Sequence, residues 1–413
     1  MLRGTPLLPA VTFYLALSLL PSLSSAQGYP TTGDSATDAA RGKSAETARR
    51  FRSLAPSLVQ SAAIKPGDLV TISGGPAMIE EMEALGVEVL KAGGRPLLTL
   101  NSPRLTHSLY AEMPEKYLDG RPTAWEAFEA QAVDVAFELP SGEDFARLRG
   151  SDPARRKRVD QAFAKLEAAT AAQRDKGKTR TLFIAVPTLS DTASIQMDYG
   201  QYEKMAWAAI EADYKEMRAK GEQIRQILAG AKKLHITSPE GTDFTVNLGP
   251  RPVFVRAGVV PPGTKGSAAS RYSSLPSGSV IFAPMEATAN GKIRAAEDQC
   301  DKPVRDEAVD VRNGMPVNVS SASDEECLKR SLKEAGRVGN ITIGLNPNVK
   351  FEHVPSYAPQ LQNAAGVVQI GFSPNQDLGG ANPPAPGGWS VPLLKATVEA
   401  DGKVIVRDGQ LAL

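Results

Sequence analysis

The chain has 413 residues, of which 42% are hydrophobic and 23% charged, and its formal net charge is +1. This length and composition are typical of a globular protein with two domains. The near-neutral charge gives no indication of a nucleic acid or an anionic membrane surface as a partner.

The N-terminus has the features of an export signal. Arg3 supplies a positive charge, residues 11–20 form an apolar core, and small residues end at Ala26 in a cleavage-site pattern. The apolar run is too short to span a membrane. We predict a signal peptide over residues 1–26, a flexible tail over residues 27–46, and an exported protein, periplasmic or secreted, without membrane contact after cleavage. A buried N-terminal helix is the alternative.

Helices and strands alternate in the next part of the chain. The expected elements are a helix at 47–61, a strand at 69–73, a helix at 77–92, a strand at 97–100, strands at 133–138 and 181–186, charged helices within 152–178, and one long helix at 200–233. A strand–helix–strand unit of this kind forms a parallel pair by a right-handed crossover. The pattern predicts an α/β domain over residues 47–230, with the long helix packed between domains.

After Ala231, short strand-like segments recur between turns. They lie at 234–238, 244–248, 280–283, 292–295, 317–319, 341–344, 367–372, 396–400 and 404–406, and one helix at 324–335 interrupts them. This pattern predicts a β-rich α+β domain over residues 231–413, mostly antiparallel and barrel-like.

Cys300 and Cys327 are the only two cysteines. In an oxidising compartment we expect a disulfide between them, which would contribute roughly 3 kcal/mol through loop entropy. Two unpaired thiols are the alternative. Neither cysteine lies in a Cys/His pattern that is typical of a nucleophile.

Residues 275–291 contain an apolar run between two turns, which predicts a buried strand. Ser279 follows Gly278 at the head of this strand, where a side chain can point into a cleft. The chain has no nucleophile-elbow or S-x-x-K motif around it. A hydrolase that uses Ser279 with His353 as the base is one interpretation, and a serine that is a mere small polar substitute is the other.

A series of short motifs runs through both halves of the chain. They are Lys65-Pro66-Gly67-Asp68, Pro187-Thr188, Asp213-Tyr214, Ser238-Pro239-Glu240-Gly241-Thr242-Asp243, Leu275-Pro276-Ser277-Gly278, Ala283-Pro284-Met285-Glu286, Ala289-Asn290-Gly291 and Ile343-Gly344-Leu345-Asn346-Pro347. Their order resembles the aminopeptidase T family of metallopeptidases over nearly the whole mature chain. The resemblance implies an aminopeptidase T-like fold and a homodimer.

The same resemblance implies a site for two divalent metal ions in the C-terminal domain. The family has glutamates where this chain has Ser279 and Asn340, a histidine at Gln369, and a His-x-Asp motif at Gly388 to Ser390. Neutral hydroxyl and amide groups bind divalent ions far more weakly than carboxylates or imidazoles do. We therefore predict no metal cofactor, although the family would use two divalent ions.

The favoured hypothesis is a non-catalytic binder of a peptide or small polar ligand. Its predicted binding residues are Ser279, Glu286, Asn340, Gln369, Trp389 and Ser390, and no catalytic residue is assigned. Trp389 follows a Pro- and Gly-rich segment, where it could stack on a ligand or cover an empty cavity. An active metal-dependent aminopeptidase that releases N-terminal residues through an altered site is the main alternative, and a structural role for the dimer is a third.

Overall fold

The computed structural model describes residues 43–118, 120–121, 123–141, 152–189, 191, 197–299, 303–350, 363–385 and 387–413. The predicted signal peptide and most of the predicted tail lie outside these ranges. None of the helices in these ranges combines the length and apolar character needed to cross a bilayer.

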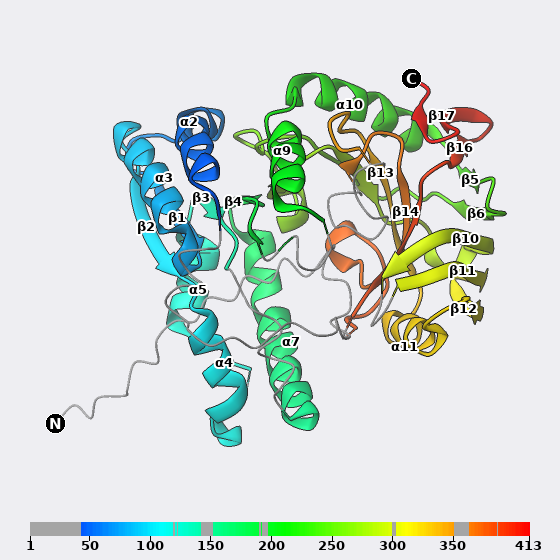
Figure 1. Cartoon of the computed structure of the whole chain (residues 1–413), viewed down its shortest axis with the longest axis horizontal. Coiled ribbons are helices and arrows are strands. Elements are labelled where there is room, and N and C mark those ends of the chain that lie inside the picture. Colours follow the sequence, from blue (N-terminus) through cyan, green and yellow to red (C-terminus); the bar gives the residue numbers. More distant parts are fainter. Residues whose placement is uncertain are drawn as a thin grey trace.

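A parallel sheet, here called sheet A, forms the core of the first region (Figure 1). Its strands are β1 (Leu69–Gly74), β2 (Arg95–Leu100), β3 (Val135–Glu138), β4 (Arg180–Ile184) and β8 (Tyr272–Leu275), in the order β2-β1-β3-β4-β8. Its helices are α2 (Ala45–Ser61), α3 (Ile79–Lys91), α4 (Pro103–Glu112), α5 (Ala124–Ala132) and α7 (Pro153–Lys176). One apolar face of the sheet packs against α2 and α3. The α/β prediction is confirmed.

The last strand of sheet A comes from the second half of the chain. Strand β8 pairs in parallel with β4, from Thr181 opposite Tyr272 to Ile184 opposite Leu275. The predicted boundary at residue 231 therefore does not separate the sheets cleanly. Four residues with two serines carry no strand-like apolar run, so local sequence gave no signal for β8.

The predicted long helix is wrong, because two helices occupy this stretch. They are α9 (Tyr199–Ile210) and α10 (Tyr214–Gly230). Asp213 has an extended backbone, and its carboxylate accepts hydrogen bonds from the N–H groups of Lys215 and Glu216 at 2.9 and 3.0 Å. This N-cap satisfies N–H groups that a new helix leaves unpaired, so α10 starts here.

Two antiparallel sheets form the second region. Sheet B has the order β12-β11-β10-β6-β5-β16-β17-β18, and sheet C has the order β15-β14-β13-β9-β7. The strands of sheet B are β5 (Lys233–Thr237), β6 (Asp243–Asn247), β10 (Asn290–Gln299), β11 (Pro303–Arg312), β12 (Met315–Ser320), β16 (Thr397–Ala400), β17 (Lys403–Arg407) and β18 (Gln410–Leu411). Those of sheet C are β7 (Val253–Arg256), β9 (Ser279–Phe282), β13 (Val338–Gly344), β14 (Val368–Phe372) and β15 (Trp389–Leu393). Short 3-10 helices are η1 (Pro76–Met78), η2 (Glu115–Tyr117), η3 (Ala268–Arg271), η4 (Glu286–Thr288) and η7 (Gln376–Leu378).

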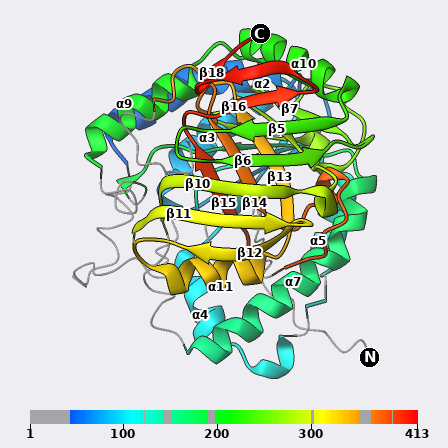
Figure 2. The same ribbon diagram turned by 90° about the vertical axis from the view of Figure 1, so that its right-hand side faces the viewer.

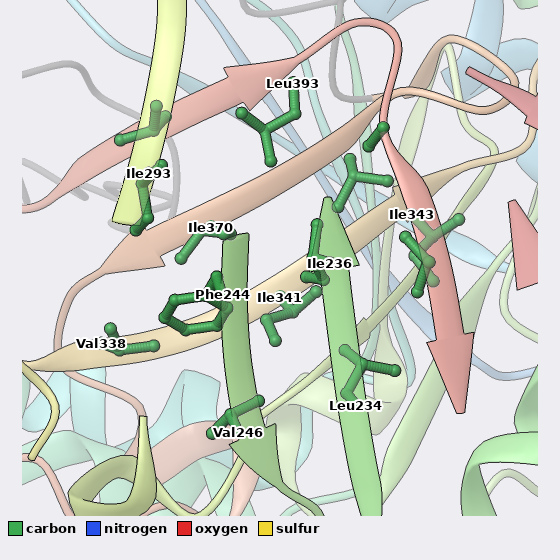
Figure 3. Packing of buried hydrophobic residues seen from close by; sticks show 14 of the residues in the cluster. Leu234, Ile236, Phe244, Val246, Ile293, Val338, Ile341, Ile343, Ile370 and Leu393 are labelled. Carbon is green, nitrogen blue, oxygen red and sulfur yellow. The ribbon is translucent and has the colours of Figure 1, made fainter. Parts of the chain in front are cut away.

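Sheets B and C pack face to face around one apolar core rather than closing into the predicted barrel. Figure 3 shows Ile236 and Phe244 of sheet B opposite Ile341 and Ile370 of sheet C. Helix α11 (Glu325–Ala335) adds Leu328 to the same core. Figures 1 and 2 show that sheet C lies between sheet B and sheet A. One face of sheet C therefore points away from the sandwich core and toward the α/β region, and we call it the outer face.

Cys327 of α11 is disulfide-bonded. The other cysteine of the chain, Cys300, lies outside the described residues. The Cys300–Cys327 pairing stays a prediction.

Candidate functional site

Four of the predicted site residues lie on the outer face of sheet C. Val280, Ile341, Ile343, Val368, Ile370, Phe372 and Val391 belong to the sandwich core. Because side chains alternate along a strand, Ser279, Gln369 and Ser390 point to the other side. Asn340, beside a register shift in β13, shares this side, since its amide lies over the outer face of Gly371. The predicted residues are thus brought together on one surface of one sheet.

The strand register shows how these residues are spaced. Ser279 pairs with Gly344 on β13, Gln369 pairs with Thr342, and Ser390 pairs with Gly371. Neighbouring strands lie about 4.8 Å apart and residues along a strand about 3.3 Å apart, so Ser279 and Gln369, which are two strands apart and offset by two residues, are separated by roughly 12 Å. That span suits a ligand of dipeptide size.

The predicted residues on the outer face differ in their solvent exposure and in their hydrogen bonds. Ser279 is only 5% exposed, whereas Ser390 is exposed and Gln369 is half-buried. The Asn340 amide donates a hydrogen bond to Ser373 Oγ at 2.9 Å, so part of its capacity is already used. Gln369 and Ser390 are therefore the two predicted residues best placed to meet a ligand from solvent.

A tight turn delivers Ser279 to this surface. Gly278 has φ of 127°, and a Cβ there would lie 2.7 Å from Met217 Sδ and 3.0 Å from the Asn346 backbone nitrogen. Only glycine fits this left-handed, crowded position. The turn packs against α10, and the Leu345 N–H donates to the Gly278 carbonyl at 2.9 Å.

The residues at the positions that the resemblance assigns to metal ligands do not fit a pair of divalent metal ions. Ser279 and Ser390 offer neutral hydroxyls, and Asn340 and Gln369 offer neutral amides. Sites of this kind need carboxylate or imidazole donors. Among the residues that the structure describes, no group of three or more His, Cys, Asp or Glu side chains is arranged to hold a metal ion.

Trp389 was predicted as a binding residue, but it does not lie on the outer face. It begins β15, is 4% exposed, and belongs to the core between sheets B and C. Its indole Nε1 donates to Glu307 Oε1 at 2.7 Å. The Pro- and Gly-rich segment before Trp389 predicted that this residue lies in a loop. It instead lies in a strand, which directs its indole into the core between the two sheets.

Glu286 is also held away from a ligand-binding role. Its carboxylate accepts hydrogen bonds from Asn375 Nδ2 and the Ala381 N–H, both at 2.7 Å, and forms an ion pair with Arg251 at 2.8 Å. Burial raises the pKa of Glu286, but these hydrogen bonds outweigh it and hold the pKa below its ordinary value. The Glu286 side chain, which lies on η4, thus holds the segment around η7 in place.

The histidines that the structure describes do not serve this surface. His107 lies on α4, and His235 lies on β5 of sheet B, where its Nε2 is 2.8 Å from Asp243 Oδ1. His353, the base of the alternative hydrolase interpretation, lies outside the described residues.

Sequence reasoning missed an arginine on the outer face. Arg256 ends β7, pairs with Ser279 in register, and is 9% exposed. Its guanidinium carbon lies 5.4 Å from the centre of the Tyr272 ring of sheet A. Burial lowers the pKa of Arg256, while Tyr272 and Asp377 act in the opposite direction. The sequence feature that could have identified Arg256 is its place as a charged residue directly after the apolar run Val253-Phe254-Val255.

A shallow hollow of about 270 Å³ lies elsewhere, against α2. It is lined by Arg49, Arg50, Ser53, Leu54, Ser57 and Glu211. Glu46 and Glu211 form ion pairs with its arginines. Its lining residues come from α2 and the end of α9, and none of them belongs to sheet C.

The sequence model of the thermophilic metalloprotease family M29 matches residues 48–351. The chain belongs to this family. The match covers the α/β region and most of the strands that carry the outer face, and it confirms the resemblance that the motifs predicted. Comparison with curated proteins gives no significant match.

Two solved structures have the same fold. AmpT from Thermus thermophilus aligns with a TM-score of 0.67 at 19% identity, covering 88% of this chain and 99% of that one. 2,5-Dihydroxypyridine dioxygenase from Pseudomonas putida KT2440 aligns with a TM-score of 0.54 at 15% identity, covering 88% and 97%. At these identities the likeness shows the fold alone. The dioxygenase shows that this fold supports more than one kind of chemistry.

Proposed function

We propose that this family member binds a peptide or another small polar ligand on the outer face of sheet C, without the family's dinuclear metal catalysis. The observation that carries the proposal is the shared face of Ser279, Gln369 and Ser390, all neutral, where the family resemblance assigns metal ligands. Hydroxyl and amide groups both donate and accept hydrogen bonds, so they suit the amide groups of a peptide.

Two measurements on the purified full chain test this proposal. Metal analysis is expected to find far less than one equivalent of zinc, cobalt or manganese. Leucine p-nitroanilide is expected to remain uncleaved with or without added metal. Near-stoichiometric metal together with hydrolysis that a chelator abolishes would contradict the proposal and establish the alternative, an active aminopeptidase with an altered site.

Ligand binding has its own test. A thermal-shift screen of dipeptides is expected to find compounds that raise Tm, and Gln369→Ala is expected to reduce that rise. Gln60→Ala on α2 is the matched control, since it removes the same side-chain amide from an exposed helix position outside sheet C. If no dipeptide raises Tm, a structural role becomes the better hypothesis.

We also propose that the protein is exported. The support is the pattern in residues 1–26, together with the disulfide at Cys327, because disulfides persist in oxidising compartments. Expression in a Gram-negative host should give a mature chain that starts at Gln27 in the periplasm or medium. Full-length protein retained in the cytoplasm would contradict export.

A homodimer is a further proposal. The support is the family resemblance and a group of exposed apolar side chains on α3, β2 and α4, namely Ile79, Val87, Leu90, Leu98, Leu100 and Leu105. Analytical ultracentrifugation should find a dimer that Leu98→Lys weakens. Val317→Lys on edge strand β12, which is exposed to a similar degree, should leave it intact. A monomeric wild type would contradict the dimer itself.

A further inference from the structure

The outer face of sheet C carries one buried positive charge. Arg256 is 9% exposed and is stacked on Tyr272. Its Nε has no hydrogen-bond partner, and none of the described carboxylates forms an ion pair with the guanidinium. Asp377 is the acidic group that acts on it electrostatically, without such a contact. A buried charge normally persists because it is paired, and this guanidinium has no such partner among the described residues.

The residue opposite Arg256 offers no anionic partner. Arg256 and Ser279 are cross-strand partners on β7 and β9, and both side chains lie on the outer face. Directly opposed residues have Cβ atoms about 5 Å apart, close enough for a glutamate at position 279 to form an ion pair with the arginine. The serine at this position offers only a neutral hydroxyl.

We propose that Arg256 is the anion-recognition group of this surface and that the ligand carries a carboxylate, which the guanidinium binds beside Ser279. This inference rests on the proposed ligand-binding function and narrows its ligand class. The planar guanidinium matches a carboxylate with two parallel hydrogen bonds, and its carbon lies over the Tyr272 ring. The free C-terminus of a short peptide and a small dicarboxylic acid both present this chemistry.

Calorimetric titration of the full chain in chelator-treated buffer separates the possibilities. The probes are Ala-Leu, Ala-Leu-amide and succinate. Ala-Leu is expected to bind at least about tenfold more tightly than its amide, because a charge-assisted pair is lost in the amide. Arg256→Met should abolish this preference, whereas Arg407→Met on β17 should retain it. Succinate binding without Ala-Leu binding would identify a small acid rather than a peptide end.

A second variant tests the proposal independently, in case Arg256→Met does not fold. Ser279→Glu should place a carboxylate against Arg256, so it should remove the preference for the acid while leaving Tm equal or higher. Equal binding of Ala-Leu and its amide to wild type would overturn carboxylate recognition but leave the ligand-binding proposal standing. Undiminished acid preference in Ser279→Glu would also overturn it. Failure of all three probes to bind would overturn both proposals.

Discussion

Glu138 has an unusual ionisation, and its cause is its position at the end of β3. The side chain is 6% exposed. Burial is the main cause that raises its pKa to about 8, Glu129 adds to the effect, and Arg174 opposes it. The folded protein therefore holds a proton on this carboxyl at pH values where the unfolded chain has released it.

Replacing Glu138 with glutamine should change how stability depends on pH. Between about pH 4.5 and 8, folding takes up a proton at Glu138, so wild-type stability falls as pH rises through this window. Glu138→Gln is expected to unfold like wild type near pH 4.5 and to be more stable by on the order of 4 kcal/mol at pH 8. Urea unfolding at several pH values measures this. Parallel stability curves for the two proteins would contradict it.

A second residue-scale prediction concerns Trp389 and Glu307. The indole is the donor to a carboxylate whose pKa burial raises to about 7, although the hydrogen bonds from Trp389 and Asp298 lower it. Trp389→Phe removes that donor inside the core and should cost about 2–4 kcal/mol in the free energy of unfolding.

The pair can be separated by a double-mutant cycle. Glu307→Gln in the Trp389→Phe background should recover part of the loss, because a neutral amide is cheaper to bury than a carboxylate without its donor. Ligand binding should be unchanged in the folded variants. A loss of ligand binding with unchanged stability would instead support the original prediction that Trp389 contacts a ligand.

At the scale of elements, the break between α9 and α10 depends on Asp213. Asp213→Ala removes the cap of α10 and should cost about 1 kcal/mol, whereas Asp213→Asn should cost little, because asparagine caps a helix about as well as aspartate. Chemical denaturation of the three proteins compares them. Equal losses for alanine and asparagine would show that the carboxylate charge, rather than the cap, matters.

The strands also differ in how well the sequence predicted them. Strands with an apolar run, such as β1, β9 and β14, were predicted within one or two residues, because buried strands consist mainly of apolar residues. Strands β7, β8, β11, β15 and β18 were missed. The short strands β7, β8 and β15 owe their pairing to partners elsewhere in the chain, and no local pattern records that. Strand β11 is ten residues long, and its many charged residues interrupt the apolar pattern.

The positions of the predicted site residues in the fold were predictable to a similar extent. The resemblance pointed to Ser279, Asn340, Gln369 and Ser390, and the structure gathers all four on one face. It could not show that Glu286 is satisfied by Asn375 and Ala381, since such contacts arise only in the folded chain. Trp389 and Ser390 are adjacent, yet they point to opposite faces, and a strand assignment was needed to separate them.

At the scale of the whole molecule, the two predicted domains share sheet A through β8. A fragment of residues 43–230 lacks this strand, which leaves the edge of β4 unpaired and Leu275 missing from the apolar core. We expect it to aggregate or to unfold without cooperativity, and calorimetry measures this. A fragment of residues 43–280, which restores β8, is the matched comparison. A cooperative transition in the shorter fragment near the wild-type Tm would contradict the prediction.

Strand β8 also has a consequence for the order in which the chain folds during synthesis. When residue 230 leaves the ribosome, sheet A lacks its fifth strand, β8. Strands β5, β6 and β7, which belong to the two other sheets, emerge before β8 does. Domain-by-domain folding, the usual route for a growing chain, is therefore interrupted here. The nascent protein must keep an open strand edge protected until β8 arrives, so its demand for chaperones should peak midway through translation.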